Sequence, residues 1–293
     1  MISIIINPVA GGATPDEARA RVELARAVLE RHGEPGEVSL TTQRGHAVDL
    51  AAVAVARGDR LVVSWGGDGT VNEVASSLVG TRSVLGLVPS GSGNGLAREL
   101  RIPQAPAAAL REAISAAPRR IDAGRMADRW FFSVAGIGFD AHVAAAFDRD
   151  GSARRGLSTY VRLTVKALWS YAPARYTIDG GASFPAFLVT AANSAQFGNG
   201  IRIAPEARLD DGRLDLVVFE ERSRLSTLLN MPRLVTGSVA RAPGVTIRSI
   251  TEAVIECDAP MPFHVDGEPR QGGSRIDVRV VPQALLVAAG GRP

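Results

Sequence analysis

Three glycines and one carboxylate follow an apolar run of the kind that forms a buried strand. Gly66, Gly67, Asp68 and Gly69 follow residues 61–64 after a single tryptophan, Trp65, and a helical pattern begins shortly afterwards. Glycine lets main-chain N–H groups approach a ligand closely, and a helix N-terminus adds unpaired N–H groups and the positive end of a dipole. This arrangement predicts a site for nucleotide phosphates, with Asp68 near the metal that a nucleotide carries. A tight turn with a capping Asp is the simpler alternative.

Four other segments accompany this loop along the chain. Asn7-Pro8 and two glycines follow the first apolar run, and a Gly-Ser-Gly-Asn-Gly loop at residues 91–95 follows another. The remaining two are an acidic turn at residues 205–215 and Val-Asp-Gly-Glu at residues 265–268. In this order and spacing, the five segments resemble the catalytic domain of the diacylglycerol kinase family, which includes bacterial lipid kinases and sphingosine kinases.

The resemblance implies a kinase that uses ATP and Mg²⁺ to phosphorylate the hydroxyl of a diacylglycerol- or sphingosine-like lipid. Relatives bind ATP at positions that match Thr41, the run from Gly67 to Glu73, and Ser92, and the glycine-loop amides add further donors. Many bacterial members have Asn-Asp where this chain has Asn94-Gly95, so the departure bears on which lipid is used. The expected ATP contacts are Thr41, Gly66, Gly67, Asp68, Gly69, Thr70, Val71, Asn72, Glu73, Ser92, Gly93 and Asn94.

Phosphoryl transfer also requires a base for the attacking hydroxyl. In bacterial relatives the residue that matches Glu268 is the proton acceptor, whereas the sphingosine kinase branch assigns this work to the residue that matches Asp68. We favour Glu268 as the base and Asp68 as the organiser of the nucleotide's Mg²⁺. A solvated turn is the plain alternative for residues 265–268.

The resemblance further implies a structural Mg²⁺ site in the acidic turn. Its ligands would be the carboxylate of Asp211 and the backbone carbonyls of Arg208 and Arg213. Oxygen ligands of this kind suit a hard divalent cation. A hairpin whose aspartates simply favour the turn explains the same residues equally well.

The elements that must position these residues change character near residue 120. Before it, short apolar runs alternate with helical patterns, which predicts an α/β domain with a parallel, Rossmann-like sheet at residues 1–120. Such sheets bind ligands beyond the carboxyl ends of their strands, where all three N-terminal motifs lie. After it, strand patterns dominate and predict an antiparallel β-sandwich, the lipid-substrate domain, at residues 121–293. Asp-Gly pairs at residues 211–212 and 266–267 indicate turns.

The expected strands are residues 2–6, 38–41, 61–64 and 84–88 in the first domain, then 130–135, 175–178, 184–191, 214–219, 245–250, 253–258, 263–265, 276–281 and 285–288. The expected helices are residues 15–31, 46–56, 71–78, 94–100 and 105–116, then 138–147, 157–171 and 225–236.

Composition limits the partners. The net charge is only +3, so we expect no nucleic-acid partner, and the single lysine, Lys166, lies in neither a P-loop nor a protein-kinase context. The lone Cys257 suits a reducing cytoplasm, and the sequence predicts neither a signal peptide nor a membrane span. We therefore expect a cytoplasmic enzyme that meets its lipid at the membrane surface, and a homodimer stays open.

One helical segment suggests how the chain meets a membrane. Apolar residues recur at helical spacing between residues 157 and 168, with Arg155, Arg162 and Lys166 beside them. A basic amphipathic helix of this kind can rest on an anionic bilayer. An ordinary helix packed on the sandwich is the alternative.

Two other functions fit parts of the sequence. NAD kinases share the glycine–aspartate loop and a sandwich-like domain, but their Thr-Gly-Ser-Thr-Ala-Tyr segment is absent. A non-catalytic lipid- or nucleotide-binding homologue is the other alternative, and intact Asp68 and Glu268 argue against it.

Two remaining features have structural interpretations. Gly136 and Gly138 have the form of a dinucleotide fingerprint, but residues 151–174 lack the acidic residue that it requires, so we expect close packing or substrate-side backbone. The histidines, His264 among them, lack metal-ligand spacing and are expected to be surface or packed residues.

Overall fold

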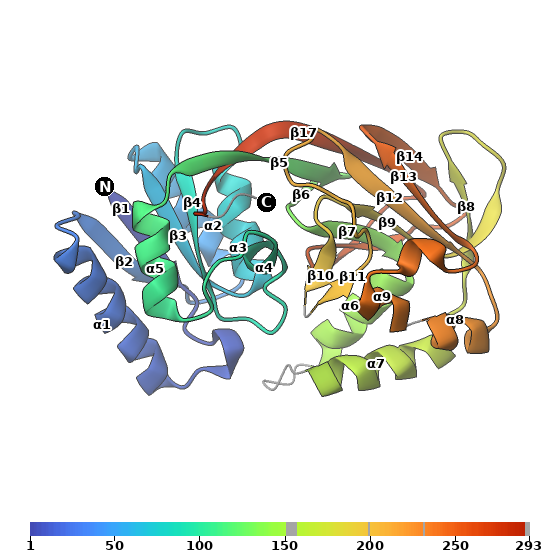
Figure 1. Ribbon diagram of the computed structural model, residues 1–293, viewed down its shortest axis with the longest axis horizontal. Helices are drawn as coiled ribbons and strands as arrows, with labels where there is room; N and C mark the ends of the chain where they lie inside the picture. The colour runs from blue at the N-terminus through green and yellow to red at the C-terminus, as the bar shows by residue number, and fades with distance from the viewer. Residues whose placement is uncertain (151–156, 199, 231, 291–293) are drawn as a thin grey trace. The chain divides into compact units, whose positions relative to one another are not determined.

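The computed structural model describes residues 1–150, 157–198, 200–230 and 232–290. The chain divides into two compact units (Figure 1). Unit 1 comprises Met1–Ile121 and Gln283–Pro293, and unit 2 comprises Asp122–Pro282. Among the described residues, no helix combines the length and the apolar composition that crossing a membrane requires.

Unit 1 is built on a parallel sheet, as the alternating pattern predicts. Its strands follow the spatial order β2 (Gly36–Leu40), β1 (Ile2–Ile6), β3 (Leu61–Gly66) and β4 (Val84–Pro89). The end of β17 (Arg275–Ala288) adds a further parallel strand, since Leu286 and Val287 pair with Val84 and Leu85. Strands β1 and β3 are buried along their whole length, which explains why each is apolar apart from one small serine.

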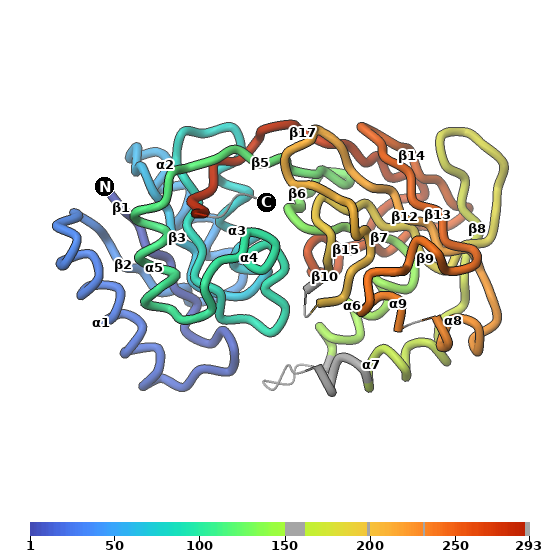
Figure 2. The backbone as a smooth tube through the Cα atoms, viewed as in Figure 1, coloured from blue at the N-terminus to red at the C-terminus, as the bar shows by residue number. Residues whose placement is uncertain are grey.

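Helices cover both faces of this sheet (Figure 2). Helices α2 (His46–Ala56) and α3 (Asp68–Leu78) pack together on one face, and α1 (Pro15–Arg31) and α5 (Pro106–Ser115) pack on the other. Helix α1 begins where its sequence dictates, because Thr14 and Glu17 form a capping box and Pro15 occupies the first turn. Two shorter helical segments, η1 (Ala10–Gly12) and α4 (Gly95–Glu99), follow the ends of β1 and β4.

Helix α3 begins three residues earlier than its pattern predicts. The expected start was residue 71, but the Val71 N–H already donates to the Gly67 carbonyl at 3.0 Å. Glycine has low helix propensity, so Gly69 concealed the first turn. The glycine–aspartate segment is therefore a strand end joined directly to a helix N-terminus.

Unit 2 is an antiparallel β-sandwich, as expected. One sheet contains β7 (Val134–Gly138), β9 (Phe184–Ala192), β12 (Leu214–Glu220), β13 (Val245–Ile250), β15 (Pro262–Val265) and β16 (Glu268–Gln271). The other contains β14 (Glu252–Glu256), β17, β5 (Pro118–Met126) and β6 (Arg129–Phe131). Strand β8 (Ala174–Ile178) pairs with both β9 and β14, and β10 (Gln196–Gly198) pairs with β11 (Ile201–Arg202).

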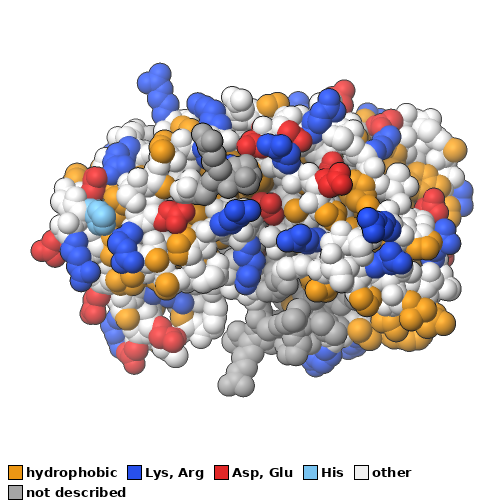
Figure 3. All heavy atoms as spheres, viewed as in Figure 1, with side chains coloured by type: hydrophobic (Ala, Val, Ile, Leu, Met, Phe, Trp, Pro, Cys, Tyr) orange, Lys and Arg blue, Asp and Glu red, His pale blue; other side chains and the backbone are white. Residues whose placement is uncertain are grey.

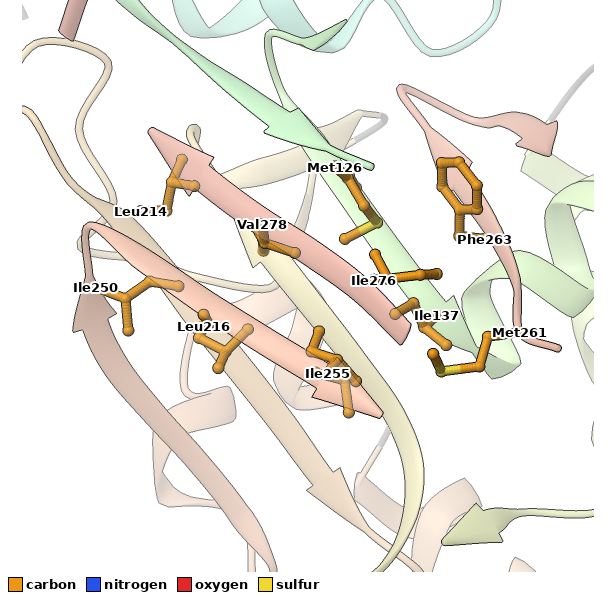
Figure 4. Packing of buried hydrophobic residues seen from close by; sticks show 14 of the residues in the cluster. Met126, Ile137, Leu214, Leu216, Ile250, Ile255, Met261, Phe263, Ile276 and Val278 are labelled. Atoms are coloured by element: carbon orange, nitrogen blue, oxygen red, sulfur yellow. The ribbon is translucent and has the colours of Figure 1, made fainter. Parts of the chain in front are cut away.

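Alternating residues of the first sheet enter two different cores. Val189 of β9 and Leu216 of β12 belong to the core between the sheets (Figure 4), which also takes Ile276 and Val278 from β17. Their neighbours Leu188 and Val217 point to the opposite face. Helices α6 (Phe139–Asp150) and α7 (Leu157–Ser170) pack on that face and contribute Phe139, Val143, Ala167 and Leu168 to the second core. Short helices α8 (Arg224–Asn230), α9 (Pro232–Thr236) and η2 (Val239–Arg241) complete the unit.

Several predicted elements were wrong in extent. The expected strand at residues 130–135 is two strands, β6 and β7, and the strands β5 and β16 were not expected at all. The expected helix at residues 225–236 is two helices, with Pro232 opening α9.

The final strand differs most from its expected form. Strand β17 is continuous where two strands were predicted, because Pro282 and Gln283, with a φ of 51°, interrupt its alternation without ending it. Its last residues group with unit 1, whereas they fall within the predicted second domain, residues 121–293.

Candidate active site

The carboxyl edge of the unit 1 sheet gathers the predicted nucleotide residues. Asn7 follows β1, Thr41 follows β2 and Gly67 follows β3. The Thr41 N–H donates to the Ile6 carbonyl at 2.9 Å, and the Asn7 N–H donates to the Trp65 carbonyl at 2.9 Å. Segments from three neighbouring strands therefore leave the sheet side by side.

Asp68 fastens the glycine loop after β4 to the start of α3. Its Oδ2 accepts the Asn94 N–H at 2.8 Å, and its Oδ1 accepts the Gly95 N–H at 2.7 Å. These are N–H groups at the start of α4, which have no partner within that helix. A carboxylate at a helix N-terminus is also favoured by the helix dipole. We call this arrangement the Asp68 clamp.

Glycine is required where the two loops meet. A Cβ atom at Gly91 would lie 2.6 Å from the Gly67 Cα, and a Cβ atom at Gly93 would lie 2.6 Å from the Asp68 Oδ2. Real Cβ atoms do not approach other atoms this closely, so any side chain at either position would push the loops apart. The glycine-rich composition of both loops follows from this close approach.

Asn94 closes the second loop on itself. Its Oδ1 accepts the Gly91 N–H at 2.8 Å, and its Nδ2 donates to the Gly91 carbonyl at 2.8 Å. Its backbone has a φ of 53°, a conformation that asparagine tolerates better than most residues. Arg98 donates from Nε to the Gly93 carbonyl at 2.9 Å, so the loop that contains Ser92 and Gly93 is held at both ends.

Two predicted residues of α3 hold the segments that follow β1 and β2. The Thr70 Oγ1 accepts the Asn7 Nδ2–H at 3.0 Å, and the Glu73 Oε1 accepts the Gly45 N–H at 2.9 Å. Thr70 and Glu73 therefore stabilise the segments that follow β1 and β2. Asn72 lies between them, and its Oδ1 accepts the Ser76 hydroxyl at 3.5 Å.

Sequence reasoning missed Arg21 as a member of this site. Its guanidinium donates to the carbonyls of Asn7 at 3.1 Å and Ala10 at 2.9 Å. Burial lowers the pKa of Arg21 and the charge of Glu17 opposes this, but arginine stays charged, so a half-buried cation lies beside Asn7. Arg21 occupies an ordinary amphipathic helix, and no local signal would have identified it.

The turn that carries Glu268 lies in unit 2. Asp266 and Gly267 have φ values of 49° and 83°, and they connect β15 and β16 as a two-residue hairpin turn, as the Asp-Gly signal indicated. The Asp266 carboxylate accepts three backbone N–H groups, from Phe132 at 3.0 Å, Ser133 at 2.8 Å and Val134 at 3.1 Å. Glu268 is half-buried directly after this anchored turn.

The acidic turn also lies in unit 2. Asp211 is exposed, and its Oδ1 accepts the Arg213 N–H at 3.0 Å, a contact that stabilises the turn itself. Burial raises the pKa of Asp215, and the negative charges of Asp211 and Glu206 raise it further. Within the described ranges, no three His, Cys, Asp or Glu side chains form a metal-binding group. The predicted site uses one carboxylate and two backbone carbonyls.

The structure therefore brings the predicted ATP residues together within unit 1. It places Glu268 and the predicted metal ligands Arg208, Asp211 and Arg213 in unit 2. In chemical terms, unit 1 offers first-turn amides, hydroxyls and a carboxylate at one sheet edge, and unit 2 offers a carboxylate on an anchored turn.

Comparisons with known proteins match both halves of the chain. Residues 1–126 match the family described as diacylglycerol kinase catalytic domain, and residues 133–289 match the YegS C-terminal NAD kinase beta sandwich-like domain. The chain is 31% identical over 280 residues to the "Probable lipid kinase YegS-like" of Chromohalobacter salexigens, across 92% of this chain and 90% of that protein. It is 29% identical to a "Diacylglycerol kinase" of Mycobacterium tuberculosis, across 91% and 88% of the two chains.

Solved structures resemble the fold at low sequence identity. A diacylglycerol kinase from Bacillus anthracis superposes with a TM-score of 0.73 at 18% identity, across 98% of this chain and 96% of the other. An NAD kinase from Archaeoglobus fulgidus, solved in complex with ATP, gives a TM-score of 0.54 at 12% identity, across 99% and 94% of the two chains. At such identities the likeness shows the fold alone.

Proposed function

Because the chain belongs to the diacylglycerol kinase family and is an ATP-dependent lipid kinase, we propose that it transfers the γ-phosphoryl group of ATP to a hydroxyl of a diacylglycerol- or sphingosine-like lipid. The observation that carries this proposal is the Asp68 clamp. It joins two glycine loops at the carboxyl edge of a parallel sheet, the edge at which such sheets bind ligands.

The triphosphate of ATP would be held by main-chain N–H groups. The first-turn amides of α3, at Asp68, Gly69 and Thr70, lie at the positive end of the helix dipole. Thr41, Ser92 and the loop around Gly93 would complete the ATP contacts. Arg21 supplies positive charge beside Asn7, in a chain without a P-loop lysine.

Glu268 would accept the proton of the lipid hydroxyl. A general base must hold one position relative to the hydroxyl that it deprotonates. The three amide hydrogen bonds to Asp266 fix the turn from which Glu268 extends, so the structure supports this role. Asp68, whose carboxylate already serves two amides, is better suited to organise the nucleotide than to remove a proton.

Two Mg²⁺ sites fit the residues present. An ionised carboxylate offers about four acceptor positions, so the two amides do not prevent Asp68 from meeting the nucleotide's Mg²⁺, which would neutralise phosphate charge. A structural ion would be held by the Asp211 carboxylate and the carbonyls of Arg208 and Arg213. Burial is the main cause of the raised pKa of Asp215, and the negative charges of Asp211 and Glu206 add to it; a cation at this turn would offset those charges.

An exposed apolar surface on unit 2 supports contact with a lipid bilayer. Trp169 of α7 is 62% exposed, and Leu225 and Leu229 of α8 are 66% and 70% exposed. Figure 3 shows hydrophobic side chains gathered at this end of the unit. Leu228 and Val235 extend the patch, and Arg224 lies 5.4 Å from the Trp169 ring. Of the basic residues expected on α7, Arg162 and Lys166 are exposed, and Arg155 lies outside the described residues.

A phosphate-transfer assay with γ-labelled ATP tests the function. Diacylglycerol, sphingosine and NAD are offered as acceptors in parallel, with Mg²⁺ or with EDTA. We expect label in a lipid only when Mg²⁺ is present, and a loss of at least about 100-fold in kcat for Glu268→Gln. Label in NAD with none in any lipid would replace this proposal with an NAD kinase activity.

A further inference from the structure

The turn that precedes Glu268 is held by a second set of contacts, separate from the bonds to Asp266. The Gly267 N–H donates to Nδ1 of His264 at 3.2 Å. His264 is only 2% exposed, and its Nε2 lies 3.3 Å from Oδ2 of Asp140. The same Oδ2 accepts the Thr190 hydroxyl at 2.5 Å, and the Asp140 Oδ1 accepts the Ala141 N–H at 2.8 Å.

Strand register places Thr190, Gly136 and His264 side by side across three neighbouring strands, and we call this set the row. Thr190 of β9 pairs with Gly136 of β7, and Gly136 pairs with His264 of β15. A Cβ atom at Gly136 would lie 1.8 Å from the Asp140 Oδ2, so the glycine leaves the space that the carboxylate occupies. Close packing, one of the two interpretations of this glycine from the sequence, is therefore confirmed, and the group that packs there is the carboxyl group of Asp140.

The surroundings make this row unusual. The rows before and after it on the same face pair Gly138 with Leu188 and Val134 with Ala192. Leu188, Val134 and Ala192 belong to the apolar packing beneath α6 and α7. Burying a carboxylate and an imidazole among apolar side chains is unfavourable unless both are hydrogen-bonded. Both side chains are hydrogen-bonded, Asp140 to Thr190 and Ala141, and His264 to Gly267. The Nδ1 atom of His264 is the acceptor for the turn before Glu268.

The hydrogen bonds also define the state of the imidazole. Because Nδ1 accepts the Gly267 N–H, the proton of the neutral ring lies on Nε2, which faces the Asp140 Oδ2 at 3.3 Å. Thr190 orients the carboxylate of Asp140. That carboxylate favours the His264 tautomer with its proton on Nε2, and in this tautomer Nδ1 has a lone pair that accepts the Gly267 N–H. Loss of either partner would release Gly267, the residue adjacent to Glu268.

We propose that Asp140 and His264 are positioning residues for Glu268, and that they act through the Gly267 N–H to hold the base in place for proton removal. The proposal rests on the proposed function, in which Glu268 is the base. Neither residue touches the substrate in this scheme. Their effect should therefore appear in kcat more than in the KM for ATP.

Three substitutions of His264 distinguish its two contacts, that of Nδ1 with the Gly267 N–H and that of Nε2 with Asp140. His264→Ala removes both and is expected to lower kcat on the order of 10- to 100-fold, since small misplacements of a catalytic group have effects of this size. His264→Asn keeps an acceptor near the Nδ1 position and should recover part of that loss. His264→Gln keeps a group near the Nε2 position but offers Gly267 no acceptor, and it should not recover activity.

Phe263→Leu is the matched control for destabilisation. Phe263 precedes His264 on β15, but its side chain lies in the opposite core. It should lower the melting temperature while leaving kcat near the wild-type value. Equal loss of kcat at equal loss of melting temperature in Phe263→Leu and His264→Ala would overturn the proposal, because general destabilisation would then account for both.

A double-mutant cycle tests whether the two residues act as one unit. Asp140→Asn places an amide where the carboxylate meets three donors, from Thr190, Ala141 and His264, and it is expected to lower kcat about as much as His264→Ala. The double variant should lose no more than either single variant, because residues of one chain of contacts are non-additive. Losses that multiply would contradict a shared route through Gly267.

Amide hydrogen exchange supplies a measurement that needs no activity. Gly267 in the free protein should exchange faster in His264→Ala and Asp140→Asn than in wild type, and close to the wild-type rate in His264→Asn. Unchanged exchange overturns the positioning role even if the enzyme is a lipid kinase. Faster exchange in a protein that phosphorylates no lipid would instead leave the turn contact standing and remove the proposed function.

Discussion

Asp68 acts on both glycine loops at once. It opens α3 and accepts the backbone N–H groups of Asn94 and Gly95, so one carboxylate fixes the geometry of segments that are 26 and 27 residues apart. The usual view of such a residue is a metal ligand or a base. Here its first physical role is to hold the main-chain donors in position, which is the preorganisation that phosphoryl transfer requires.

Asp68→Asn should therefore abolish most turnover while the fold survives. The amide would present a donor to one of the two N–H groups that now donate to the carboxylate, and the loop after β4 would separate from α3. We expect kcat to fall on the order of 100-fold or more, with far-UV circular dichroism unchanged. Asp49→Asn, an exposed carboxylate on α2, is the control. Turnover comparable to wild type in Asp68→Asn would refute the assignment.

Asp59 governs stability rather than chemistry. Its side chain is 1% exposed and accepts Arg57 Nη2 at 2.8 Å and the Ser3 hydroxyl at 2.7 Å. The hydrogen bond from Arg57, followed by that from Ser3, lowers the pKa of Asp59 against the opposing effect of burial. Because the folded pKa lies below the unfolded one, the stabilisation is present above the ordinary pKa of aspartate and is lost as the pH falls below it.

Asp59→Asn is expected to destabilise the protein by about 1.5–3 kcal/mol at pH 7, the range for hydrogen bonds to charged groups. The difference from wild type should shrink below about pH 4, where the carboxylate takes up a proton in the unfolded chain before it does so in the folded protein. Denaturant unfolding at pH 7 and pH 3.5 measures both values. Asp16→Asn, at an exposed ion pair, should change stability by less than about 1 kcal/mol; a difference for Asp59→Asn that is independent of pH would contradict this account.

At the scale of elements, the helices of unit 2 divide into packed and unpacked faces. Helix α7 sends Ala167 and Leu168 into the core beneath it, which supports the alternative of an ordinary packed helix for that face. The same helix exposes Trp169, and α8 buries none of its residues. The packed face therefore fits the ordinary helix, whereas contact with a bilayer stays a prediction. The exposed leucines of α8 extend the apolar surface beyond what the sequence suggested.

We predict that Leu225→Ser/Leu229→Ser weakens binding to vesicles that contain anionic lipid by about tenfold or more, because burial of each leucine is worth about 1.5–3 kcal/mol. Val48→Ser/Val53→Ser is the matched control, since these residues are 38% and 60% exposed on α2 of unit 1. Co-sedimentation measures the binding. Equal sedimentation of both double variants would exclude α8 from the membrane contact.

At the scale of the molecule, β17 links the two units through one continuous strand. Its first part pairs with β14 in unit 2, and its last part pairs with β4 in unit 1. Val287 is fully buried in the sheet of unit 1, although it lies near the end of the chain. The sheet of unit 1 therefore includes a strand that is far from its neighbour β4 in the sequence.

Val287→Asp should loosen unit 1 selectively, since an unpaired charge in a sheet core is strongly unfavourable. Hydrogen exchange should show reduced protection of β3 and β4, with β9 and β12 of unit 2 close to wild type. Val53→Asp, at an exposed position, is the control. Loss of protection in unit 2 with unit 1 unchanged would contradict the prediction, because it would show that the end of β17 stabilises unit 2 rather than unit 1.

Local patterns in the sequence were sufficient for most of unit 1. Apolar runs, the capping box at Thr14 and the glycines after each strand depend on neighbours within a few residues, so the predicted bounds of β1, α1 and α2 are confirmed. The same reasoning found the hairpin at Asp266-Gly267, because its backbone conformation is a local property. The family resemblance is confirmed for the same reason, since its motifs are short and contiguous.

Only the tertiary structure decided which of these groups meet. The contact of Asp68 with the Asn94 and Gly95 amides, the half-buried Arg21 beside Asn7, and the row from Thr190 through Gly136 to His264 each join segments that are distant in sequence. The return of β17 to unit 1 is of the same kind. Propensity and periodicity act over a few residues, whereas strand register and burial of a shared core select partners across the whole chain.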